Sequence, residues 1–102
     1  MNSVTRGSGN IFRDLGLPDS TNLEIKASLV LRISRIIERR RLTQVQAARI
    51  LGIDQPKVSM LLRGRYEGFS IERILRFLTA LDQDVKITIA PKRRGVAEVR
   101  VA

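Results

Sequence analysis

Residues 43–64 read TQVQAARILGIDQPKVSMLLRG, and this stretch predicts two short helices joined by a tight turn. Thr43 suits the N-cap of the first helix, because Gln46 stands three residues later and completes a capping box. Gly52 follows the last apolar residue of that helix and fits a left-handed C-terminal position. Asp54 then offers an N-cap for the second helix.

The apolar residues of this stretch predict one buried face for each helix. We expect Val45, Ala48 and Leu51 to be buried in the first helix, and Val58, Leu61 and Leu62 in the second. The outer face of the second helix is then rich in hydrogen-bond donors, which favours a polar partner. Two amphipathic helices joined through a glycine also occur in other small helical domains, so the spacing alone leaves the function open.

The composition favours an anionic partner. The chain has 102 residues, enough for one small domain, and 43% of them are hydrophobic. Lysine and arginine number 19 against 10 acidic residues, which gives a net charge of +9. Nine of the basic residues lie between Arg32 and Arg65, where Glu38 and Asp54 alone oppose them. This clustering favours nucleic acid over a membrane surface.

The chain lacks cysteine and histidine, which limits the catalytic and metal-binding chemistry open to it. Without cysteine or histidine the chain has no disulfide, no thiolate and none of the usual zinc ligand sets, so we expect no metal and no cofactor. An enzyme is the weakest interpretation, since no carboxylates or lysines stand at a recognisable catalytic spacing. No run of eighteen apolar residues exists, and we expect a soluble cytoplasmic protein without membrane association.

The flanking sequence completes a mainly α, small helical bundle. Residues 1–10 are polar and glycine-rich and are expected to form a flexible tail, and residues 11–84 the helical domain. A long helix is expected from Thr21 to about Arg40, and a last helix after Ser70. On the long helix, arginines 32, 35 and 39 form a positive ridge that runs into Arg40 and Arg41. Such a ridge is either a solvated helix face or a surface that approaches phosphate.

After Asp84 the spacing of the apolar residues changes from a helical repeat to alternation. Val85, Ile87 and Ile89 alternate with polar or small residues, which predicts a β-strand. An isolated hairpin is marginal, so the strand needs a partner, either residues 96–101 of the same chain or a second chain. We favour the second chain. If the chain binds duplex DNA as a dimer, something rigid must hold the two helices that enter the major groove about 34 Å apart. Residues 85–102 are therefore assigned to dimerisation.

The order NIFRDLGLP, a basic long helix, LTQVQAARILGIDQPKVSMLLRG and FSIERILRFLTALDQDVKITI resembles the Xre/Cro-type regulators and, within that group, the HigA-like antitoxins. The most specific elements are QPKVS…LLRG and the following FS-x-x-R-x-L. The resemblance implies a lambda-repressor-like helix-turn-helix fold and a homodimer on a palindromic operator in duplex DNA. It also implies repression of the chain's own operon and a RelE/HigB-type toxin as partner.

The basic ridge and the resemblance together indicate which residues meet DNA. The expected set is Arg40, Arg41, Thr43, Gln44, Gln55, Lys57, Ser59, Arg63 and Arg65. Gln44 matches a position that contacts phosphate. The Gln55 amide can pair with adenine and Lys57 can donate to guanine, whereas Arg63 and Arg65 are expected to contact the DNA backbone. Met60 departs from the pattern, because many phage repressors have a polar residue there; it either touches a thymine methyl or packs.

Two other functions stay open at this point. A stand-alone repressor without a toxin has the same DNA chemistry, and the sequence barely separates it from an antitoxin. An RNA-binding protein would use the same basic surface. Against RNA, the chain has three phenylalanines and one tyrosine, which form no evident platform for stacking single-stranded bases.

Overall fold

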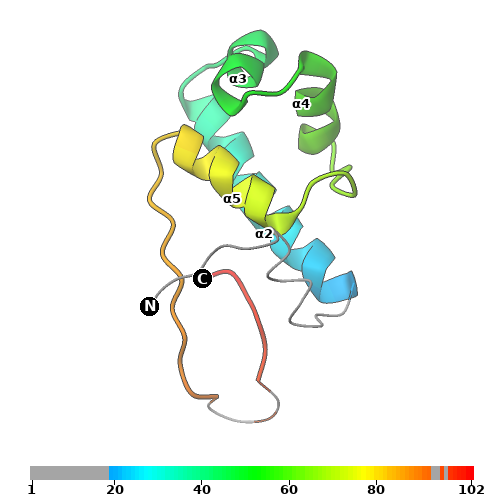
Figure 1. The fold of residues 1–102 in the computed structure, drawn as a ribbon. Helices are drawn as coiled ribbons and strands as arrows, with labels where there is room; N and C mark the ends of the chain where they lie inside the picture. The colour runs from blue at the N-terminus through cyan, green and yellow to red at the C-terminus, as the bar shows by residue number, and fades with distance from the viewer. Residues whose placement is uncertain (1–18, 93–94, 96) are drawn as a thin grey trace.

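The computed structural model describes residues 19–92, 95 and 97–102. Within these residues the chain forms four helices, named α2 (Asp19–Arg39), α3 (Gln44–Leu51), α4 (Gln55–Leu62) and α5 (Ile71–Ala80). Figure 1 shows α5 lying along the long helix α2, with α3 and α4 together at one end of this pair. The mainly helical fold with a helix-turn-helix is thus confirmed. The expected flexible tail, residues 1–10, lies outside the described residues.

Four of the expected helix boundaries depend on caps, and three of these caps are as expected. Thr43 and Gln46 form a complete capping box, and the Asp54 side chain accepts a hydrogen bond from the Lys57 backbone N–H at 2.9 Å. The Ser70 hydroxyl accepts one from Arg73 at the start of α5, at 3.1 Å. Thr21 is the exception, because α2 already includes Asp19 and Thr21 lies inside its first turns.

One hydrophobic core joins the four helices. Its buried side chains are Ile25, Leu29, Val30, Ile33, Ile36, Ile37, Ala47, Ala48, Leu51, Val58, Leu61, Phe69, Ile71, Ile74, Phe77, Leu78 and Leu81. One expected member is wrong, because Val45 is 50% exposed whereas Ala47 is fully buried. The helix-turn-helix therefore packs through two successive alanines, which let α3 approach its neighbours closely. Leu62 is half-buried and packs at the edge of the core.

All four helices are followed, one or two residues after their last residue, by a residue with positive φ. Gly52 and Gly64 have φ of 74° and 90°, but Arg41 and Asp82 also adopt this conformation, at 54° and 64°. After Arg41, the Leu42 N–H bonds the Ile37 carbonyl and the Arg41 N–H bonds that of Glu38, which is a Schellman motif. The same arrangement at Asp82 joins it to Thr79 and Gln83 to Leu78. A non-glycine residue here costs backbone free energy.

The predicted C-terminal strand is not present in this chain by itself. Residues 84–92 follow α5 as an extended segment that runs clear of the helices (Figure 1), and the described residues contain no β-strand. No backbone hydrogen bond joins residues 84–92 to residues 97–102 within the described part of the chain. Side-chain alternation predicts an extended backbone, but a strand also needs a paired neighbour, and the tail does not provide one here.

Residues 97–102 return towards α2 instead. Val101 packs against the core, and the guanidinium of Arg32 donates a hydrogen bond to the backbone carbonyl of Ala102. Among the described helices, none combines the length and the apolar character that crossing a membrane requires.

Candidate nucleic-acid interface

The first helix of the motif, α3, presents its N-terminus at the surface. Thr43 occupies the N-cap, where its hydroxyl accepts from the Gln46 N–H at 3.1 Å and its own N–H donates to the Gln46 side chain at 2.8 Å. Gln44, the first helical residue, has an exposed side chain without a hydrogen bond in the described part of the structure. Its amide is therefore available to an external acceptor, beside the partial positive charge of a helix N-terminus.

The turn between α3 and α4 fixes the direction of the second helix. Gly52 closes α3 in the left-handed conformation, and its N–H bonds the Ala48 carbonyl at 2.9 Å. Ile53 is half-buried and packs on the core, and only Asp54 separates it from α4. Asp54 caps α4, and Pro56 lies in the first turn, where a missing backbone N–H costs little.

Helix α4 is buried on one side only. Val58 and Leu61 are both fully buried and hold the helix on the core. Residues at intervals of three and four share a side of a helix, so Pro56, Met60 and Arg63 line the side opposite these anchors. Gln55 and Lys57 are exposed at the start of the helix, and Ser59 is half-buried. At about 100° per residue, Gln55 and Lys57 lie on opposite flanks of this outward side, and Ser59 lies between Gln55 and its centre.

Basic residues border this outward surface. Arg63 is the C-cap of α4, and Arg65 follows Gly64; both side chains are exposed. Arg41, between α2 and α3, is also exposed. None of these three arginines forms an ion pair with an acidic side chain of the described residues. A helix with polar ends and a basic border has the size and charge to enter the major groove of duplex DNA.

Arg40 differs from its neighbour in having an internal role. Its guanidinium donates to the Leu81 carbonyl at the end of α5, at a distance of 2.6 Å. The side chain of Gln83 donates to the same carbonyl at 3.0 Å. Arg40 therefore satisfies a carbonyl that the end of α5 leaves without a helical partner. Sequence reasoning grouped Arg40 with Arg41 because the two are adjacent; nothing in the sequence marks the contact with Leu81.

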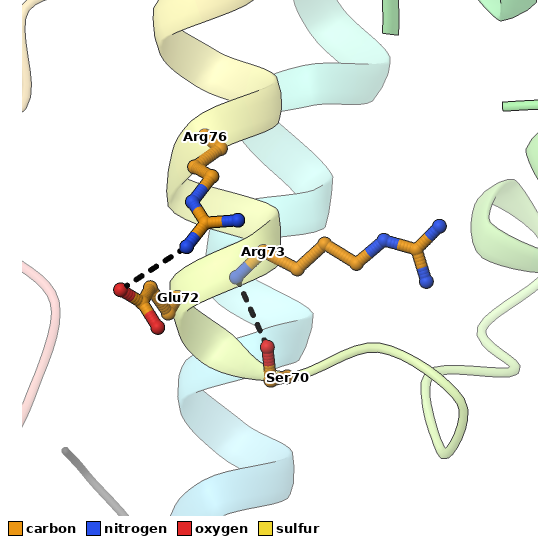
Figure 2. Close-up of polar contacts among 4 residues, drawn as sticks. All are labelled: Ser70, Glu72, Arg73 and Arg76. Carbon is orange, nitrogen blue, oxygen red and sulfur yellow. Dashed lines mark hydrogen bonds and ion pairs between the residues drawn. The ribbon is translucent and has the colours of Figure 1, made fainter. Parts of the chain in front are cut away.

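Arg73 was not among the expected site residues. Figure 2 shows it on α5, its side chain turned away from the neighbouring Glu72–Arg76 pair, which spans 3.4 Å. Its guanidinium carbon lies 5.1 Å from the ring centre of Phe69 and 5.7 Å from that of Phe77. The two rings are themselves in edge-to-face contact. Arg73 is thus a cation over buried aromatic rings, which stabilises the loop that follows α4.

Comparison with known proteins agrees with this geometry. The family model described as a helix-turn-helix domain matches residues 11–90. A solved structure of a protein assigned to the XRE family of transcriptional regulators is 46% identical, with a TM-score of 0.76, and the match covers 83% of this chain and 96% of that chain. No curated protein matches the chain significantly.

The chain therefore belongs to the helix-turn-helix domain family and, within it, to the XRE-family regulators. This confirms the Xre part of the resemblance seen in the sequence. The HigA-like part stays a prediction.

Replacing Arg41 by glycine is expected to raise stability while it weakens DNA binding. Glycine takes positive φ without steric cost, so the free energy of unfolding should rise by about 0.5–1 kcal/mol. The lost charge should weaken binding to any duplex and make the negative slope of log K against log salt shallower by about one. Urea unfolding and binding titrations across salt concentrations measure both effects.

Asp82→Gly is the matched control for Arg41→Gly. It relieves the same backbone conformation, since Asp82 has φ of 64°, but it removes no positive charge. It should therefore raise stability without weakening DNA binding. A loss of affinity shared by both variants, or a salt slope that Arg41→Gly leaves unchanged, would contradict the placement of Arg41 beside phosphate.

Proposed function

We propose that this regulator is a repressor that binds a palindromic operator as a homodimer, with α4 in the major groove, and that it is the antitoxin of a toxin–antitoxin operon. The single observation that carries the DNA-binding part is the surface of α4. Val58 and Leu61 fix one side of the helix in the core, and the exposed remainder carries Gln55, Lys57 and Arg63, whose side chains suit base edges and phosphates.

Each contact of this surface has a role set by its chemistry. The Gln55 amide both donates and accepts, which matches N6 and N7 of adenine, and the Lys57 ammonium donates to the acceptors of guanine. Ser59 is short and half-buried, and its hydroxyl suits a phosphate or base edge at close range. The DNA backbone is contacted at the edges of this surface, by Gln44, Arg63 and Arg65.

The homodimer is supported by the extended segment. Ile87 and Ile89 are 66% and 93% exposed, and residues 84–92 make no backbone hydrogen bond to another part of the described chain. Such a segment is an edge that another strand can pair with. Antiparallel pairing centred on Ile87 places Val85 opposite Ile89 of the second copy and Lys86 opposite Thr88. All apolar side chains then share one face, and no like charges face each other.

The antitoxin part is supported by the sequence resemblance in QPKVS…LLRG and FS-x-x-R-x-L, and its test is a search for the toxin. The full chain, tagged and expressed in its native host, should retain a basic ribonuclease-like protein through purification, identified by mass spectrometry. If the chain binds its operator but retains no such protein, it is a stand-alone repressor. That result removes the antitoxin role and leaves the DNA-binding part intact.

Gln55→Ala and Gln44→Ala are expected to separate base recognition from phosphate contact. Gln55→Ala should lose discrimination at one base pair of each half-site, worth about 1–3 kcal/mol. Gln44→Ala should weaken binding to all operator variants by a similar factor. Competition binding against a set of single-base operator variants measures both. If Gln55→Ala keeps the base preferences of the unmodified chain at every position, α4 is not docked as proposed.

A further inference from the structure

The outward surface of α4 has an apolar centre. Met60 is 43% exposed, and Pro56, one turn earlier, is exposed beside it. Both lie on the side of α4 opposite the buried Val58 and Leu61, so the core does not use them. Polar and basic residues flank them along the helix, with Lys57 one turn before Met60 and Arg63 one turn after it.

The side chain of Met60 makes no hydrogen bond within the described structure. Its backbone carbonyl accepts from the N–H groups of Arg63 and Arg65, which completes the end of α4. Its side chain has no hydrogen-bond donor and at most a weak acceptor, so it cannot hold a phosphate or match a donor–acceptor pair on a base edge. What it offers to a partner is a flexible and polarisable apolar surface.

The major groove presents one apolar group, the C5-methyl of a pyrimidine. Thymine always has this methyl, and cytosine has it only when methylated. In the proposed docking, the centre of the outward surface of α4 faces the floor of the groove, and Met60 is at that centre. If the base lacks the C5-methyl, the binding free energy loses the contribution from burying one methyl group against Met60.

We propose that Met60 determines specificity by contacting the C5-methyl group of a pyrimidine at the centre of each operator half-site. This inference rests on the proposed function, because it takes α4 to lie in the major groove. The methyl group belongs to thymine in unmodified DNA. The same chemistry accepts 5-methylcytosine, so methylation of a cytosine at that position makes it a better substitute for thymine.

The test begins with an operator selected from a random duplex library by the full-length chain. Each thymine of one half-site is then replaced in turn by deoxyuridine, which removes the methyl and keeps the base pairing. One replacement should weaken binding of the unmodified chain about fourfold, as expected for the burial of one carbon. The same replacement should leave the affinity of Met60→Ala nearly unchanged, because the contacting side chain is already gone.

Two further variants define the contact. Met60→Leu stays apolar and should keep its sensitivity to deoxyuridine, and Val45→Ala, a change at an exposed apolar residue of α3, should behave as the unmodified chain does. Replacing the sensitive thymine by cytosine should weaken binding, and 5-methylcytosine there should regain about the same fourfold. In Met60→Ala the two cytosine forms should bind equally.

Three results would overturn the inference. Deoxyuridine could be tolerated at every position, or it could weaken Met60→Ala as much as the unmodified chain, in which case another residue contacts the methyl. The third result is that no duplex is enriched at all, which defeats the proposed function and this inference with it. Enrichment of a specific duplex without methyl sensitivity leaves the proposed function standing and removes the role of Met60 alone.

Discussion

Replacing both Ile87 and Ile89 by lysine is expected to convert the proposed dimer to a monomer and to weaken binding of a full palindrome by about 10²–10⁴-fold, the usual gain from linking two binding units. The two side chains are 66% and 93% exposed, so the change leaves the core of each chain intact. In the dimer the lysines would place like charges and hydrated ammonium groups on the apolar face of the paired strands. Light scattering and titrations with full and half operators measure the two effects.

The control for this variant is Ala90→Lys. It adds a positive charge to the same exposed segment on the opposite face of the alternation, where the proposed pairing sets it opposite Asp84 of the second copy. It should stay dimeric and bind the full palindrome nearly as before. If the Ile87/Ile89 variant also stays dimeric and binds the palindrome with unchanged affinity, residues 84–92 are not the dimer contact and the pairing centred on Ile87 is wrong.

Leu61→Ala is expected to lower the free energy of unfolding by about 2–5 kcal/mol, the range for emptying a fully buried leucine position. Leu61 is 0% exposed, and it holds α4 against the other helices from the centre of the core. A domain of this size has a total free energy of unfolding of about 5–15 kcal/mol. The loss should therefore move the unfolding midpoint to a much lower urea concentration. Urea unfolding followed by circular dichroism, at fixed chain concentration, measures the loss.

Leu62→Ala makes the same chemical change one residue further on. Because Leu62 is half-buried, less apolar surface is lost and the cavity is open to water, so the destabilisation should be clearly smaller. Equal losses for the two variants would mean that α4 is rotated about its axis relative to the structure. In that case the outward surface assigned to Gln55, Met60 and Arg63 would also be wrong.

The helix-turn-helix could be predicted from the sequence because its boundaries depend on local chemistry. The Thr43 capping box, the left-handed Gly52 and the caps at Asp54 and Ser70 each involve residues within four positions of one another. Such interactions are the same in any tertiary context. The outward residues of α4 followed from the same local periodicity, since two buried anchors define the opposite side of a helix.

The interactions that sequence reasoning missed are those between distant residues. Val45 is apolar and correctly spaced for the core, but it is 50% exposed, whereas Ala47 is fully buried, because the tertiary packing decides which side of α3 faces the core. The contact between Arg40 and the Leu81 carbonyl spans forty-one positions. The strand at residues 85–90 failed for a related reason, since a strand exists only where a partner pairs with it.

If α4 is the helix that reads DNA, an NMR titration of the isotope-labelled full chain with its selected operator should strongly shift the backbone amides from Gln55 to Arg65 and that of Gln44. The amides of the α2 segment from Leu23 to Leu31 should not shift. A random duplex should shift the basic margins at Arg41 and Arg65 and leave the centre of α4 less affected. Operator-specific shifts confined to α2, with α4 unchanged, would mean that α4 does not lie in the major groove.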